Sequence, residues 1–109
     1  MKQIRNFDVT VNDMKTIILS EIVTDTYTNA SGYGLFVMLN DAISNKEKVS
    51  VSFKGATPTS SSFLNSSLGE LIEDYGMDVF KTYVKLVDLN KSQVTVLRRY
   101  FDSINNINA

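Results

Sequence analysis

Apolar and polar residues along the chain follow two periods, one typical of strands and the other typical of helices. Alternating positions predict four short strands. They cover residues 4–11, 16–23, 49–53 and 82–89. The turn-forming pair Asn12-Asp13 separates the first two strands, so we expect these two strands to form a hairpin.

Three other stretches carry apolar residues three or four positions apart, which places those residues on one face of a helix. They are residues 31–43, residues 62–75 and the stretch after Asn90. Ser31 or Asn29 is expected to cap the first helix, and Gly76 suits the C-terminal end of the second. Asn90 and Gln93 have the spacing of a capping box for the third.

The resulting order, β-β-α-β-α-β-α, predicts an α/β (α+β) fold in which helices pack against one sheet. We expect a single mixed sheet of about four strands with about three helices. The sheet is mixed because the hairpin adds an antiparallel pair to strands joined by right-handed crossovers. The 109 residues have the length of one domain, and no change of composition divides them.

The composition of the chain excludes several kinds of active site. The chain has neither Cys nor His, which excludes a thiol nucleophile, a Cys/His zinc site and a Ser-His-Asp triad. No two carboxylates are placed at a shared site, so we expect no enzyme activity, no metal and no cofactor. A net charge of −1 argues against nucleic acid as a partner. No apolar run is long enough for a membrane span or a signal peptide, and together with the absence of Cys this predicts a cytoplasmic protein.

One segment carries a motif. The apolar strand VSVSFKG is followed by ATPT and then by Ser60-Ser61-Ser62-Phe63 at the start of a helix. This order resembles the STAS family (sulphate transporter and anti-sigma factor antagonist), and more closely the bacterial STAS-like domain of unknown function. In that family the strand ends in Asp-Leu-Ser-Gly and the helix opens with Asp-Ser-Ser-Gly. The resemblance covers residues 49–90 and implies one STAS-like domain over residues 1–109.

Three positions depart from the family pattern. Ser60 replaces the Asp before the helix, Phe63 replaces the Gly, and Ser52 stands where the strand has its Asp. Ser60, Ser61 and Ser62 all suit the N-terminus of a helix, but one serine is enough for a cap. Phe63 falls one position off the apolar stripe, so it is either a core residue or an exposed residue that contacts a partner.

The resemblance implies a non-catalytic regulatory module. In anti-sigma factor antagonists the first Ser of Asp-Ser-Ser-Gly is phosphorylated by a partner kinase, and its counterpart here is Ser61. The implied partner is therefore an ATP-binding kinase or an anti-sigma-type protein, with Ser60, Ser61, Ser62 and Phe63 as the phosphoacceptor and partner-binding segment. Glu70, Glu73 and Asp74 are either a solvated face or a docking patch for a basic partner.

A second function stays open. The chain is short and lacks catalytic motifs, which also fits a phage or mobile-element inhibitor, anti-defence or anti-CRISPR-like, that binds and blocks a host complex. A homodimer is compatible with both functions, because an unpaired edge strand can pair with a second copy of the chain.

Overall fold

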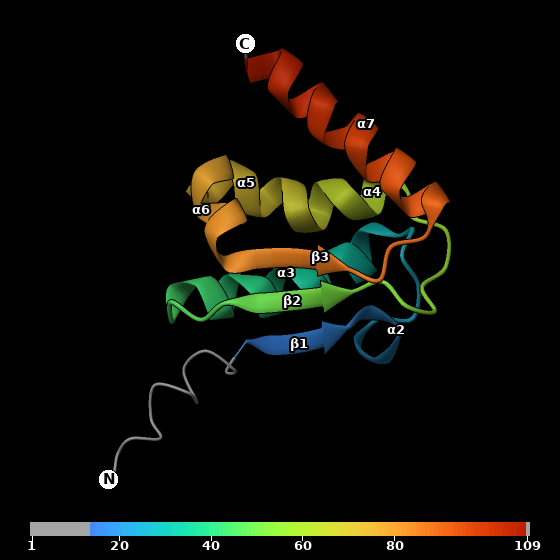
Figure 1. The fold of residues 1–109 in the computed structure, drawn as a ribbon, viewed down its shortest axis with the longest axis horizontal. Coiled ribbons are helices and arrows are strands. Elements are labelled where there is room, and N and C mark those ends of the chain that lie inside the picture. The colour runs from blue at the N-terminus through green and yellow to red at the C-terminus, as the bar shows by residue number, and fades with distance from the viewer. Residues whose placement is uncertain (1–13, 109) are drawn as a thin grey trace, which may run out of the picture.

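The computed structural model describes the backbone of residues 14–108 and the side chains of residues 14–104. Three parallel strands form the described sheet in the order β1-β2-β3 (Figure 1). They are β1 (Lys15–Ile18), β2 (Val49–Ser52) and β3 (Val84–Val87). The α/β fold is thus confirmed, but the described sheet is parallel and three-stranded rather than mixed. The predicted strand 4–11, and with it the hairpin, lies outside the described residues.

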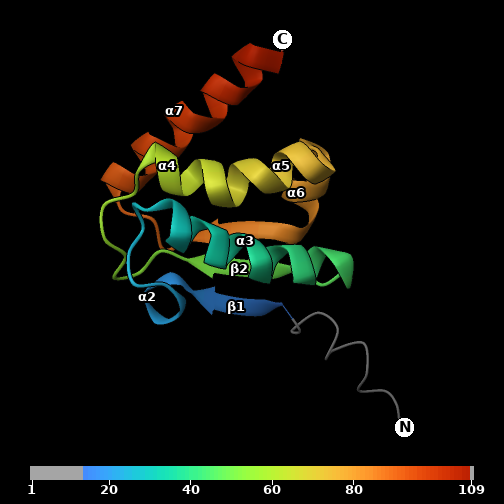
Figure 2. The ribbon, with the colours of Figure 1, turned by 180° about the vertical axis from the view of Figure 1, so that it is seen from behind.

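Both crossovers lie on the same face of this sheet. Helix α3 (Asn29–Ser44) connects β1 to β2, and a helical stretch that begins at Ser61 connects β2 to β3. In Figure 2 α3 lies in front of the strands, with this second stretch beside it. Right-handed crossovers between strands in sequential order place every connection on one face. The opposite face exposes Thr16 and Lys85.

The predicted strand 16–23 is half strand and half helix. After β1 ends at Ile18, α2 (Leu19–Ile22) forms a single helical turn. Ile18 pairs with Ser52, and both strands end there, so the ladder offers no further partner. The helical turn instead buries the Leu19 side chain completely.

The predicted strand 82–89 is also shorter in the structure. Gly76 ends the preceding helix with a φ of 92°, as predicted from its position. Helix α6 (Met77–Tyr83) follows, and it was not predicted. Phe80 is its one buried residue. The segment is too short to show a helical period, so its packing rather than its pattern makes it a helix.

The last helix, α7 (Lys91–Asn108), begins as predicted. The backbone N–H of Asn90 donates to Oε1 of Gln93 at 2.9 Å, and the N–H of Gln93 donates to Oδ1 of Asn90 at 2.7 Å. Both halves of the capping box are therefore formed. No helix in the described range is long and apolar enough to cross a membrane.

The predicted helix 62–75 has a wide turn in its middle. It consists of α4 (Ser61–Leu64), the π-helical turn η1 (Asn65–Gly69) and α5 (Glu70–Tyr75). Its buried residues come in pairs four positions apart, Phe63-Leu64, Ser67-Leu68 and Leu71-Ile72. This spacing exceeds the 3.6 residues of an α-helical turn, and a π turn accommodates the difference.

Gly32 of α3 makes the closest contact between the two crossover helices. A Cβ at this position would collide with Oγ of Ser66 and lie 2.5 Å from the carbonyl oxygen of Phe63. The Ser66 hydroxyl donates to the carbonyl of Asn29 at 3.0 Å and so joins η1 to α3. Only glycine permits this approach.

Replacing this glycine should therefore loosen the helical layer. We expect Gly32→Ala to lower the free energy of unfolding by about 1–3 kcal/mol, the usual cost of overpacking. Gly34→Ala is the matched control on the same helix, because its Cβ would meet only a Val23 methyl at 3.7 Å. The control should be neutral or stabilising by up to about 1 kcal/mol. Urea unfolding measures both, and equal effects would contradict the packing argument.

Candidate functional site

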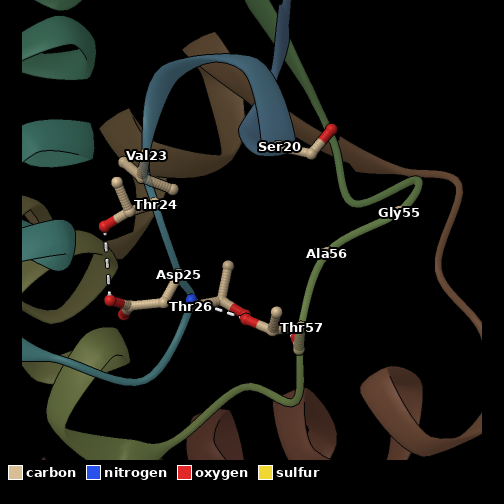
Figure 3. Close-up of a pocket in the computed structure, with 8 residues that line it drawn as sticks. All are labelled: Ser20, Val23, Thr24, Asp25, Thr26, Gly55, Ala56 and Thr57. Carbon is tan, nitrogen blue, oxygen red and sulfur yellow. Dashed lines mark hydrogen bonds between the residues drawn. The ribbon is translucent and has the colours of Figure 1, made fainter.

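The segments that follow the three strands meet at one edge of the sheet, because parallel strands have their carboxyl ends on the same side. These segments are residues 19–28, 53–60 and 88–90, and together we call them the loop edge. A cleft of about 220 Å³ lies between the first two segments (Figure 3). Its lining residues are Ser20, Val23, Thr24, Asp25, Thr26, Gly55, Ala56 and Thr57.

Thr26 joins the two sides of the cleft. Its side chain is only 1% exposed. Its N–H donates to Oγ1 of Thr57 at 2.9 Å, and its hydroxyl reaches the carbonyl oxygens of Thr57 and Pro58. The N–H of Ser60 in turn donates to the carbonyl of Thr26 at 3.1 Å. These bonds fix the start of α4 relative to the segment that leaves β1.

Asp25 organises the start of α3. Its Oδ1 accepts from the N–H groups of Tyr27 at 3.0 Å and Thr28 at 2.9 Å, and from the Thr28 hydroxyl at 2.9 Å. Thr28 then caps α3 by accepting from the N–H of Ser31 at 3.2 Å. Ser31 and Asn29 were predicted as caps, and this was wrong because the Asp25 turn starts the helix one residue earlier.

Hydrogen bonding also affects the acidity of Asp25. The bond from the N–H of Tyr27 is the main cause that lowers the pKa of its carboxyl, and the bonds from Thr28 act in the same direction. The carboxylate points away from residues 55–57 and toward the Thr24 hydroxyl (Figure 3). Asp25 is therefore a charged support for the loop edge rather than a group aimed into the cleft.

The three serines of the motif have different surroundings. Ser60 is the N-cap of α4: its Oγ accepts from the N–H of Phe63 at 3.2 Å and donates to the carbonyl of Tyr27 at 2.7 Å. Ser61 and Ser62 follow it in the first turn of α4, and both are exposed. Capping thus occupies Ser60 alone, and the next two hydroxyls lie at the surface.

Phe63 lies in the core with an exposed fraction of 0%. Of the two alternatives for Phe63, the core residue is confirmed and the exposed contact residue is wrong. The exposed alternative assumed one α-helical stripe through Leu64, whereas the π turn lets two adjacent positions per turn face the core. Ser67 makes this possible inside the helix, because its buried hydroxyl donates to the Phe63 carbonyl at 2.7 Å.

The acidic residues Glu70, Glu73 and Asp74 are all exposed on α5. Their spacing places them on one side of the helix, and α5 lies at the opposite end of the helical stretch from α4 (Figure 1). The structure therefore does not bring them together with the serines.

Burial, and to a lesser extent the charge of Glu70, raises the pKa of Tyr100 on α7.

Asp88 is a residue of the loop edge that no pattern in the sequence indicated. Ser52, which stands where the family strand has its Asp, donates from its hydroxyl to Oδ2 of Asp88 at 2.6 Å. Asp88 has a φ of 57°, a left-handed conformation that Asp tolerates better than most residues. A carboxylate is thus present beside this strand end, but it comes from the segment after β3.

The loop edge offers mainly hydroxyl groups and the carboxylates of Asp25 and Asp88. Several of these groups already serve as caps and ties within the fold. Across the part of the chain that the structure describes, no three carboxylates gather as metal ligands do. The arrangement is therefore a rigid polar surface at the start of two neighbouring helices, and such a surface is suited to recognition.

A family model described as a STAS-like domain of unknown function matches residues 37–94, just over half of the chain. The match runs from the middle of α3 to the first turn of α7 and includes the serine motif. It confirms the resemblance predicted from the sequence. No curated protein and no solved structure matches the chain significantly.

The hydroxyl of Thr26 should be important for stability. Thr26→Val keeps the shape but removes the hydrogen bonds to the carbonyl groups of Thr57 and Pro58, at a cost of about 0.5–1.5 kcal/mol. Thr24→Val is the matched control, because Thr24 is exposed and its hydroxyl makes only a 3.4 Å contact. The control should change stability by less than about 0.5 kcal/mol in the same unfolding assay.

Asp25 should make stability depend on pH. Its carboxyl has a lowered pKa in the folded chain, so its stabilising effect is full above the unfolded pKa of about 3.9 and disappears as the pH falls through the lower folded value. Asp25→Ala should therefore be less stable than wild type near neutral pH and equally stable in strong acid. Asp25→Asn keeps one acceptor oxygen and should recover part of the loss without the pH dependence. Thermal unfolding across this range would contradict the argument if the wild-type and Ala curves stayed parallel.

Proposed function

Because the chain belongs to the STAS-like family of unknown function, we propose that it is a non-catalytic regulatory module that binds a partner protein through the loop edge. The partner class is an ATP-binding kinase or an anti-sigma-type protein, and Ser61 is the phosphoacceptor. The single observation that carries this proposal is the position of Ser61: it is exposed directly after the serine that caps α4.

A phosphate on Ser61 would be compatible with the fold. It would lie in the first turn of the helical stretch, where the free N–H groups and the helix dipole favour negative charge. The cap itself belongs to Ser60, so modification of Ser61 breaks none of the bonds that Ser60 makes to Phe63 and Tyr27. The modification would add about −1.5 to −2 charges to the surface and so could end a partner contact without unfolding the domain.

Two departures from the family motif are compatible with this function. Ser60 replaces an Asp, and both residue types are good N-caps. Phe63 replaces a Gly, but its side chain points into the core and leaves the surface beside Ser61 free. A kinase can therefore approach Ser61 without meeting the aromatic ring.

The first experiment is an affinity pull-down of the tagged chain from its native host, with mass spectrometry of the captured proteins and of the serine peptides of the chain itself. Recovery of an ATP-binding kinase or anti-sigma-type protein, with phosphate on Ser61, supports the proposal. Recovery of a large host complex with an unmodified chain contradicts it and favours an inhibitor that blocks that complex.

The switch is tested with the captured partner. Ser61→Asp should weaken binding at least about tenfold, and Ser61→Ala should bind like the wild type, because only the first adds charge to the contact surface. Ser92→Asp is the matched control: Ser92 is also exposed in the first turn of a capped helix, α7, but lies on another element. Calorimetry measures the three affinities. Equal weakening by Ser61→Asp and Ser92→Asp would indicate a general charge effect and reject the switch.

A further inference from the structure

Helix α3 is a surface helix with an unusually apolar outer side. Asp41 is the one charged residue among its sixteen. Its inner side is fully packed in the core, yet the outer side exposes Tyr33 to 61% and Val37 to 46%. In Figure 2 α3 lies in front of the strands, and no described element lies in front of α3. Surface helices usually carry charged residues on this side.

The residues of the outer side are arranged symmetrically along α3. Val37 lies near the middle of the helix, and Tyr33 and Asp41 lie four positions before and after it. Ala30 and Ser44 lie seven positions before and after it, and both are exposed. Residues at these spacings share one side of a helix. The outer side therefore has an apolar residue at its centre, with a tyrosine hydroxyl on one side of it and a carboxylate on the other.

We propose that α3 pairs with α3 of a second copy of this chain in an antiparallel, two-fold symmetric dimer centred on Val37. A two-fold axis at this residue places Val37 against its own counterpart, and it places Tyr33 opposite the second copy's Asp41. Each Tyr33 hydroxyl then has a carboxylate as its acceptor. Each Ala30 lies opposite a Ser44, whose hydroxyl lies 3.3 Å from that of Tyr75 in its own chain, so small residues meet toward both ends of the interface.

Charge beyond the helix ends supports the same antiparallel orientation. Asp25 precedes α3 and is held as a carboxylate by the hydrogen bonds from Tyr27 and Thr28. Lys46 and Lys48 are exposed just after the other end of the helix, with the exposed Glu47 between them. An antiparallel pair centred on Val37 brings the Lys46 end of one copy to the Asp25 end of the other, at both ends of the interface. The helix dipoles of an antiparallel pair also oppose each other, which is favourable.

The central residue gives a sharp test, because in this register position 37 meets itself. The wild-type chain should sediment as a dimer at micromolar concentrations. Val37→Glu and Val37→Lys should each weaken the dimer more than about tenfold, since each places like charges face to face. An equimolar mixture of the two variants should form a dimer again, since Glu then faces Lys. Thr95→Glu, on an exposed position of α7, should leave the wild-type dimer intact.

Three outcomes overturn the proposal. They are a wild-type chain that stays monomeric at all concentrations tested, a Val37→Glu variant that stays dimeric, and a mixture of the two charged variants that stays monomeric. Circular dichroism of each variant checks the fold, and Val37 is exposed enough for its replacement to leave the core unchanged. None of these readouts depends on Ser61, so the dimer and the phosphorylation switch succeed or fail separately.

Discussion

The handedness of the crossover connections is the constraint on which the rest of this structure depends. Three parallel strands in sequential order, joined by right-handed crossovers, require both helical connections to lie on one face of the sheet. The two connections then become neighbours and start side by side at the carboxyl edge. The close contact at Gly32, the bonds of Thr26 and the position of Ser61 all follow from this placement.

Some polar side chains at the loop edge form hydrogen bonds within the fold, and others are left at the surface. Asp25 holds Thr28, and Thr28 caps α3. Thr26 and Ser60 join the second crossover to the first by bonds to backbone groups. Because these contacts tie the segments of the edge to one another, the edge is preformed before any partner arrives. A preformed surface of this kind loses little conformational entropy on binding.

Elements that repeat their hydrophobic period several times, or that carry a local cap, could be predicted from the sequence. Elements that are set by tertiary contacts could not. The alternation around Val51 and the capping box of Asn90 and Gln93 are complete within a few residues, and both predictions hold. The turn α2 and the helix α6 are too short to show a period. The burial of Phe63 depends on a π turn that a period of 3.6 does not contain, and the bond from Ser52 to Asp88 spans 36 positions. The serine motif was found because it is contiguous, and the loop-edge ties were missed because they are not.

The π turn η1 also affects which side of α4 faces solvent. An i→i+5 turn contains one residue more than an α-helical turn, so everything on its N-terminal side is rotated by about 100° relative to a continuous α-helix. The direction in which the Ser61 side chain points therefore depends on η1 as well as on the placement of the crossover. A chain of this family with one residue fewer between Asn65 and Gly69 could keep the same core residues on α5 and yet present a different side of α4 to solvent. The extra residue of the π turn thus changes the rotation of α4 about its axis while the strands stay the same.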